Sequence, residues 1–210
     1  MSAMHTIVLN SDQNMLLGLL QGFSDSYYLA GGTAIALQAG HRRSIDFDLF
    51  SPDEIDANRL TNSIIRQGRR IEHVFTISAD ELTLAVDSVR ISFVFFPFAI
   101  QHDIWFKEII SMPDLLTLAA MKAYALGRRA KWKDYVDMYV LFKNHVHFND
   151  VVARAGDIFQ GAFNQRLFRE QLCYFHDIDY SEDIEFLTDS PPEKEQIQAF
   201  LTRTAGIKIS

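Results

Sequence analysis

The stretch that decides the fold runs from Leu29 to Phe50 and reads LAGGTAIALQAGHRRSIDFDLF. A short apolar run before Gly31-Gly32 predicts a strand that enters a tight turn, and the residues after the glycines favour a short helix. Polar and apolar residues then alternate, which is typical of a strand with one buried face. Asp46 and Asp48 therefore fall on the same polar face of the predicted strand.

Two aspartates separated by one residue on a strand are suited to binding a divalent metal ion. Their backbones lie about 7 Å apart by the rise of a strand, and their carboxylates can converge on a metal pair roughly 4 Å apart. Mg²⁺ (or Mn²⁺) prefers oxygen ligands and commonly combines one or two protein carboxylates with phosphate oxygens. The Gly31-Gly32 turn adds unobstructed backbone N–H groups and a positive helix end, both suited to phosphate. Together these features predict a pocket for an NTP and its metal ion, although each alone is also typical of an ordinary turn or a solvated strand edge.

The remaining pattern predicts a sheet-bearing first half and a helical second half. Helices are expected over residues 11–23 and from Pro52 onward, and strands over residues 70–78, 81–86 and 89–98. The later helices are expected over residues 114–126, 133–143, 148–160, 164–175 and in a short segment after Pro192. This order favours an α+β fold, with a mixed sheet and flanking helices over residues 1–112 and a helical domain over residues 113–210.

The composition limits the class of protein. The 210 residues are 48% hydrophobic and 22% charged, as in an ordinary globular chain. A net charge of -7 excludes nucleic-acid binding through overall charge, so a phosphate contact requires a local basic patch. The single cysteine, Cys173, excludes an internal disulfide and a cysteine-built zinc site. The sequence shows no signal peptide and no apolar run of roughly 18 residues, so we expect no membrane partner and a cytoplasmic location.

A second group of charged residues lies at the predicted junction between the helices over residues 114–126 and 133–143. It is a dense basic cluster in an acidic protein and contains Lys122, Arg128, Arg129, Lys131 and Lys133. Two interpretations stay open, a solvated hinge or a grip on a triphosphate or an RNA, because Lys and Arg are the usual phosphate partners. Asp134 and Asp137 can in turn simply form helix-surface pairs with these basic side chains.

Together the two regions resemble the AbiEii/AbiGii-type nucleotidyltransferases, a family of the polymerase-beta-like nucleotidyltransferase superfamily. Its members are toxins of type IV toxin–antitoxin and phage abortive-infection systems. The family's glycine turn, H-R-x-S and D-x-D are matched by Gly31, Gly32, His41, Arg42, Ser44, Asp46 and Asp48. Its second block is matched by Met121-Lys122-Ala123-Tyr124, Arg128 and the run Lys133–Tyr139. The two blocks span most of residues 29–142, and we match no family motif in the last third of the chain.

The resemblance implies an enzyme that transfers a nucleoside monophosphate from an NTP to an acceptor, a tRNA or a protein, with Mg²⁺ or Mn²⁺ as cofactor. It also implies a polymerase-beta-like core followed by a helical bundle, a role as a toxin in phage defence, and a cognate antitoxin as partner. The implied catalytic residues are Asp46, Asp48, Lys122 and Asp134, with Asp137 as a second candidate for the last role, and Asp46 and Asp48 are also the implied metal ligands. The implied nucleotide-binding residues are Gly31, Gly32, Thr33, Arg42, Ser44 and Arg128.

One position departs from the pattern of a complete nucleotidyltransferase site. Such a site usually has a third carboxylate on a neighbouring strand, which acts as general base and second metal ligand, and here that place holds Ser92. A serine is no base near neutral pH. The carboxylates that could substitute for it are Glu72, Asp87, Asp103 and Glu108. Two alternatives to an enzyme therefore stay open: a nucleotide-binding or partner-binding module that kept the fold without turnover, and, less favoured, an antitoxin-like or scaffolding protein.

Overall fold

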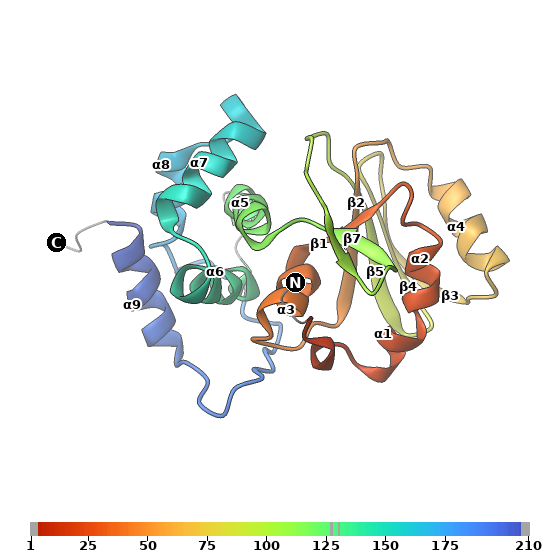
Figure 1. Cartoon of the computed structure of the whole chain (residues 1–210), viewed down its shortest axis with the longest axis horizontal. Coiled ribbons are helices and arrows are strands. Elements are labelled where there is room, and N and C mark those ends of the chain that lie inside the picture. The colour runs from red at the N-terminus through yellow and green to blue at the C-terminus, as the bar shows by residue number, and fades with distance from the viewer. Residues whose placement is uncertain (1–3, 127, 130, 207–210) are drawn as a thin grey trace. The chain divides into compact units, whose positions relative to one another are not determined.

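The computed structural model describes residues 4–126, 128–129 and 131–206, so the outer ends of the predicted domains, residues 1 and 210, lie outside the described residues. The chain forms two compact units, the first ending at Asp114 and the second beginning at Leu115. Figure 1 labels their helices and strands. The division predicted from the sequence lay between residues 112 and 113.

A mixed sheet forms the centre of the first unit. Its strands are β1 (Tyr28–Ala30), β2 (Asp46–Ser51), β3 (Ile71–Ile77), β4 (Glu81–Val86) and β5 (Val89–Phe95). The strand order is β1-β2-β5-β4-β3, with β2 parallel to β5 and the other pairs antiparallel (Figure 1). A separate hairpin of β6 (Ile104–Phe106) and β7 (Ile110–Met112) follows, which the sequence pattern did not predict.

Alternation along the strands gives the sheet one buried face and one polar face. On β2, Phe47 is fully buried, whereas Asp46 and Asp48 are half-buried. On β5, Phe93 belongs to the buried face, where its ring centroid lies 5.0 Å from that of Phe23. We call the opposite face, which carries Asp46 and Asp48, the carboxylate face.

The helices of the first unit differ from the predicted ones at two places. They are η1 (Thr6–Val8), α1 (Ser11–Met15), α2 (Leu17–Gln21), α3 (Gly31–Ala39) and α4 (Ala57–Arg66). The predicted continuous helix over residues 11–23 is wrong, because Leu16, at φ −91° and ψ −2°, separates two short helices. The prediction that Pro52 opens a helix is also wrong. The carboxylate of Asp56 accepts a hydrogen bond from the backbone N–H of Arg59 at 2.9 Å, and this cap starts α4 at Ala57.

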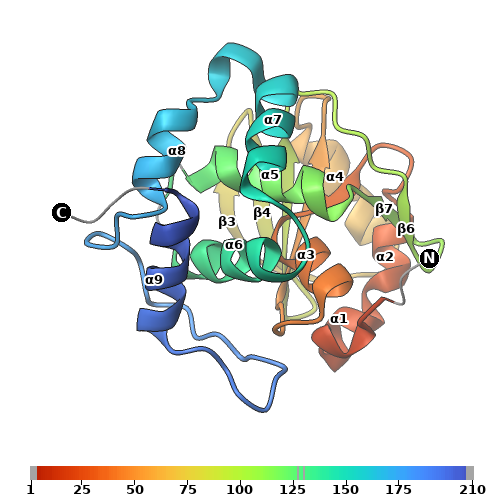
Figure 2. The ribbon, with the colours of Figure 1, turned by 60° about the vertical axis from the view of Figure 1, so that its left-hand side comes forward.

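The second unit is helical, as predicted. Its helices are α5 (Leu115–Leu126), α6 (Trp132–Asn144), α7 (Phe148–Phe159), η2 (Gln160–Ala162), α8 (Gln165–Gln171) and α9 (Lys194–Thr204). Within this unit α7 lies against α5, and α9 lies against α6 (Figure 2). Buried aromatic residues such as Tyr135, Phe159 and Phe168 contribute to its core. In the described part of the chain, no helix has both the length and the apolar character needed to cross a bilayer.

Candidate functional site

Gly31 joins the end of β1 to the start of α3 and lies directly against Asp48. Ala30, the last residue of β1, pairs with Asp48 across the sheet. Gly31 adopts a φ of +66°, a conformation that residues with a side chain rarely take. A Cβ atom at this position would overlap the carboxylate of Asp48. Glycine is therefore required for two reasons, and it brings the amino end of α3 next to a carboxylate of β2.

The amino end of α3 carries the residues predicted to hold phosphate. The helix begins at Gly31 rather than at Thr33, so both glycines and Thr33 belong to its first turn. Backbone N–H groups of a first turn have no acceptor within their own helix, and no side chain of the preceding Ala30 caps this one. Such an end attracts anions through these groups and through the helix dipole.

Two buried hydroxyls connect α3 to the start of β2. Thr33 Oγ1 lies 2.7 Å from Ser44 Oγ and donates a hydrogen bond to the backbone carbonyl of Asp46. Since the Thr33 hydroxyl has one proton, Ser44 is the donor of the bond between the two hydroxyls. The pair therefore fixes the backbone of Asp46 against α3, and the predicted contacts of Thr33 and Ser44 with a nucleotide stay predictions.

Arg42 and His41, from the H-R-x-S motif, are buried. Arg42 is 5% exposed and its Nη1 donates to the backbone carbonyl of Arg43 at 2.9 Å. His41 is 9% exposed. Both side chains are therefore buried in the loop before β2, and the predicted nucleotide contact of Arg42 stays a prediction.

The strand register places Ser92 beside Asp48. Across the parallel pair of β2 and β5, Asp46 is opposite Arg90 and Asp48 is opposite Ser92. Ser92 is 9% exposed, and its Oγ lies 3.1 Å from the hydroxyl of Thr83 on β4. The residue that adjoins the aspartate pair where a third carboxylate was expected is thus a buried serine.

Two of the carboxylates named as substitutes for a third aspartate are paired with arginines. Asp87 accepts from Arg69 at 3.2 Å, and Glu72 accepts from Arg70 at 2.7 Å. Glu81 on β4 was missed from the sequence, although its alternation with Thr83 places both on the carboxylate face. Its Oε1 lies 2.5 Å from the Thr83 hydroxyl, the same hydroxyl that contacts Ser92.

Asp46 and Asp48 fit the donor set of a Mg²⁺ site. Both carboxylates project from one face of β2, and Asp48 adjoins the amino end of α3. Mg²⁺ commonly takes one or two carboxylates and completes its shell with phosphate oxygens and water. Among residues 4–126, 128–129 and 131–206, no group of three or more His, Cys, Asp and Glu side chains is placed to hold an ion. The two aspartates therefore fit a metal that arrives with a phosphate substrate.

Lys122, Asp134 and Asp137 form a buried ion cluster in the second unit. The Nζ of Lys122 on α5 lies 2.7 Å from Asp134 Oδ1 and 3.1 Å from Asp137 Oδ2, both on α6. The Nε of Arg129 lies 3.0 Å from Asp134 Oδ2. Lys122 is 4% exposed, and both aspartates are fully buried. The structure thus brings together Lys122 and Asp134, each of which was predicted to be catalytic, and their catalytic roles stay predictions.

Charge pairing outweighs burial within this cluster. Burial alone would lower the pKa of Lys122, but the carboxylates of Asp134 and Asp137 raise that pKa above its ordinary value. Burial alone would raise the pKa of Asp134, but Lys122 and Arg129 hold that pKa below its ordinary range. Both groups are therefore charged at neutral pH.

The other basic residues of this region also have partners in the second unit. The guanidinium of Arg128 lies 3.5 Å from the ring centroid of Tyr124, and its Nη1 donates to the Tyr124 carbonyl at 2.9 Å. Lys131 pairs with Glu182 at 2.6 Å, and Lys133 pairs with the same carboxylate. The predicted phosphate contact of Arg128 stays a prediction.

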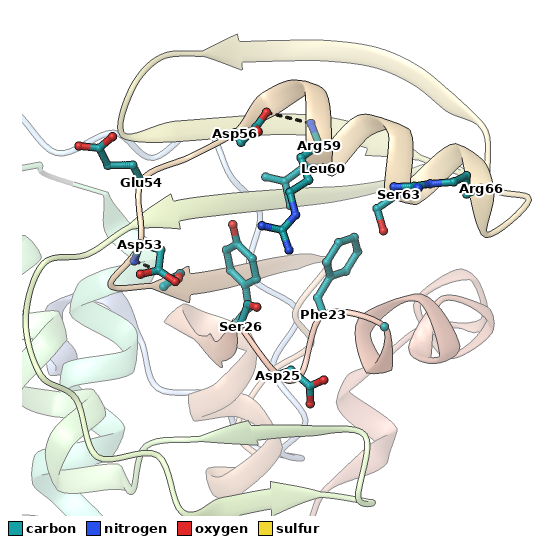
Figure 3. Close-up of a pocket in the computed structure, with 13 residues that line it drawn as sticks. Phe23, Asp25, Ser26, Asp53, Glu54, Asp56, Arg59, Leu60, Ser63 and Arg66 are labelled. Atoms are coloured by element: carbon teal, nitrogen blue, oxygen red, sulfur yellow. Dashed lines mark hydrogen bonds between the residues drawn. The ribbon is translucent and has the colours of Figure 1, made fainter.

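A cavity of about 330 Å³ opens elsewhere in the first unit (Figure 3). Its lining comes from the segment before β1, the end of β2 and α4, and includes Asp25, Asp53, Asp56 and Arg59. The side chain of Arg59 extends from α4 towards Phe23 (Figure 3). None of the residues predicted for nucleotide or metal binding lines it, so this cavity is separate from the carboxylate face.

Residues 16–179 match the model of a protein family described as the nucleotidyl transferase AbiEii toxin of type IV toxin–antitoxin systems. The chain belongs to the AbiEii family. This AbiEii-family chain is 30% identical over 128 residues to an uncharacterized protein of Aquifex aeolicus (strain VF5). The match covers 59% of this chain and 61% of the Aquifex protein, so the chain spans about six tenths of that relative's length.

Solved structures confirm the fold expected of an AbiEii-family chain. MenT4, a nucleotidyltransferase toxin from Mycobacterium tuberculosis, is similar with a TM-score of 0.63 and 17% identity, over 92% of this chain and 80% of MenT4. JHP933 from Helicobacter pylori is similar with a TM-score of 0.54 and 13% identity, over 93% of this chain and 89% of that protein. At such low identity the likeness shows the architecture, which is the predicted α+β core with helices after it.

Proposed function

We propose that this AbiEii-family protein transfers a nucleoside monophosphate from an NTP to an acceptor, a tRNA or a protein, with Mg²⁺ as cofactor. The observation that carries the proposal is the position of Asp48. Its carboxylate lies against Gly31 at the amino end of α3, on the same face of β2 as Asp46. A phosphate-binding helix end and two metal-binding carboxylates thus adjoin each other, as transfer from a metal-bound triphosphate requires.

The residues of the first unit would divide the work as follows. The backbone N–H groups of Gly31 and Gly32 would bind the triphosphate, and Asp46 and Asp48 would hold Mg²⁺. Bound there, the metal would neutralise phosphate charge and orient the reacting oxygens. The acceptor oxygen forms a bond to the α-phosphorus, the bond from that phosphorus to the bridging oxygen breaks, and pyrophosphate leaves with the electron pair. The proton of the acceptor hydroxyl passes to solvent.

The biological role that we propose is that of a toxin, acting in the cytoplasm and in phage defence, with a cognate antitoxin as partner. Membership of the AbiEii family supports the toxin and antitoxin assignments. In the second unit, Lys122 and Asp134 are proposed as further catalytic residues and Arg128 as a phosphate contact.

A second candidate function is nucleotide binding without turnover. Ser92 favours it, because this serine adjoins Asp48 where a general base would be needed. Under this proposal the carboxylates and the amino end of α3 still bind NTP and Mg²⁺, and no product forms.

Incubation with labelled NTPs, Mg²⁺, total RNA and cell protein tests both functions. The double variant Asp46→Ala/Asp48→Ala is expected to lose transfer by about a hundredfold or more, because the metal contributes several kcal/mol to such reactions. The control Asp53→Ala/Glu54→Ala removes two exposed carboxylates beyond β2 and should leave transfer unchanged.

Equal labelling by the wild type and the Asp46/Asp48 variant would contradict the proposed transfer. Isothermal titration then separates the two functions, since NTP binding that depends on Mg²⁺ without any labelled product supports the binding module. Absence of NTP binding by the wild type contradicts both.

A further inference from the structure

The carboxylate face continues beyond the aspartates to the edge strand β3, where Phe75 and Arg90 form a stacked pair. Arg90 is opposite Asp46 in the strand register. Its guanidinium carbon lies 4.7 Å from the ring centroid of Phe75, and the ring centroid of His73 lies 4.6 Å from that of Phe75. Phe75 is 50% exposed although it is a large apolar residue. We call Phe75 and Arg90 the platform.

An irregularity of β3 turns Phe75 to this face. Val74 is opposite Leu84, and Thr76 is opposite Thr83, so Phe75 is an extra residue between two consecutive pairs. A β-bulge of this kind redirects a side chain, and bulges are common beside functional sites. Leu84 is fully buried and marks the other face, whereas Thr83 contacts Ser92 on the carboxylate face. The bulge therefore places both Phe75 and Thr76 on the face of Asp46 and Asp48.

The guanidinium of Arg90 is held by the ring rather than by a carboxylate. In the part of the chain that the structure describes, no acidic side chain pairs with it. The nearby arginines of the β3–β5 region differ, since Arg69 pairs with Asp87 and Arg70 pairs with Glu72. An exposed planar cation stacked on an exposed ring is suited to contact with another flat, polar ring system.

The proposed reaction determines which side of the aspartates the acceptor occupies. The triphosphate would lie at the amino end of α3, beside β1, and an in-line displacement brings the attacking oxygen from the side opposite the leaving group. From β2, that side is the one towards β5, β4 and β3. With strands roughly 4.8 Å apart, β3 is about 14 Å from β2. An extended acceptor whose end is at the aspartates would thus pass over the platform.

We propose that Phe75 and Arg90 stack against an unpaired base of a single-stranded RNA and so position its end at Asp46 and Asp48. The inference rests on the proposed transferase function and selects RNA from its two acceptor classes. Stacking tolerates any base, because every base has a π face. Base stacking also requires no overall positive charge, and this protein has a net charge of -7 and therefore no overall attraction for a phosphate backbone.

Fluorescence anisotropy with a 5′-fluorescein single-stranded RNA of about 12 nucleotides tests the platform, since such a length exceeds one stacking site. Phe75→Ala and Arg90→Ala are each expected to weaken RNA binding by about 5- to 100-fold, the range found for a lost base–aromatic stack. Phe75→Trp should retain binding, because it keeps an aromatic surface. Ile77→Ala is the matched control, since Ile77 is also an exposed apolar residue of β3, at 66%, but is opposite Leu82 on the other face.

Titration of NTP and Mg²⁺ in the same samples separates this inference from the proposed function. Unchanged NTP binding in all variants, with RNA binding lost only in the platform variants, supports the platform. RNA binding that is unaffected by Phe75→Ala and Arg90→Ala, or equally weakened by Ile77→Ala, overturns it while NTP binding persists. Equal binding of a blunt duplex of the same RNA also overturns it, because paired bases are not available for stacking. Failure of the wild type to bind NTP instead counts against the proposed function.

Discussion

A single missing Cβ atom lets the amino end of α3 and the carboxylate of Asp48 lie in contact. Gly31 and Gly68 both have positive φ, at +66° and +75°. They differ in their surroundings, because a Cβ at Gly31 would overlap Asp48, whereas a Cβ at Gly68 would meet nothing within 4 Å. The two positions therefore separate the backbone requirement for glycine from the requirement for space.

Gly31→Ala is expected to reduce the free energy of unfolding by about 3 kcal/mol, from left-handed strain and overpacking together. Gly68→Ala has the strain alone and should cost about 1–2 kcal/mol. Urea denaturation of both variants measures the difference, and titration should show NTP binding weakened in Gly31→Ala only. Equal losses in the two variants would argue against close contact between Gly31 and Asp48.

Ser92 allows a direct test of the missing carboxylate. Ser92→Asp places a second negative charge opposite Asp48, and like charges at such separation destabilise each other. Without Mg²⁺ the melting temperature of Ser92→Asp should fall below that of the wild type by about 2–4 °C for each kcal/mol of unfolding free energy lost. Addition of Mg²⁺ should restore the melting temperature. Ser92→Asn, which has the same shape without charge, should show no such recovery in differential scanning fluorimetry. An identical response of both variants to Mg²⁺ would mean that no metal binds at Asp48.

Helices α5 and α6 are joined by a charge cluster rather than by apolar packing alone. Lys122 lies between Asp134 and Asp137, and Arg129 pairs with the Oδ2 atom of Asp134. Removing one partner of a buried pair leaves the other charge buried without compensation. Loss of one partner is therefore expected to destabilise the second unit, whatever part the cluster has in catalysis.

Lys122→Ala is expected to reduce the free energy of unfolding by about 3–5 kcal/mol, the cost of breaking a buried pair. Arg166→Ala is the matched control in the same unit, since Arg166 forms an exposed i,i+4 pair with Glu170, and such a pair contributes about 0.5 kcal/mol or less.

The pKa of Asp134 is lowered by folding, so the stabilising contribution of this carboxylate is complete above its ordinary pKa of 3.8 and disappears as pH falls through the lower folded value. The urea midpoints of the wild type and of Asp134→Asn should therefore differ at neutral pH and converge at strongly acidic pH. A constant gap would contradict this assignment.

At the scale of the whole molecule, ion pairing occupies most of the basic cluster around residues 122–133 that was considered for phosphate binding. Lys131 and Lys133 pair with Glu182, and Arg129 pairs with Asp134. With a net charge of -7, the protein has to bind an NTP or an RNA through local groups. A helix end, a metal ion and an aromatic stack all satisfy this condition, and they are the groups that the proposals assign to the first unit.

Local sequence patterns were sufficient for the centre of the site and less so for its borders. The glycine turn and the alternation through Asp46 and Asp48 predicted β1, α3 and β2, because they depend on consecutive residues. The start of α4 was misplaced, since the Asp56 cap is a weaker signal than Pro52. The hairpin of β6 and β7 was missed because its three-residue strands carry almost no periodic signal and, unlike β1, are not followed by a glycine turn.

The sequence by itself determined that the chain has the carboxylate pair of Asp46 and Asp48 on one strand face, close to a glycine turn. It also determined that a basic cluster over residues 122–133 precedes the acidic residues Asp134 and Asp137. Only the tertiary structure decided what these groups meet: Ser92 beside Asp48, Lys122 between two buried aspartates, and Phe75 on the carboxylate face. The physical reason is register. A shift of one residue moves a side chain to the other face of a sheet, and the bulge at Phe75 makes such a shift through strand pairing, which no local pattern contains.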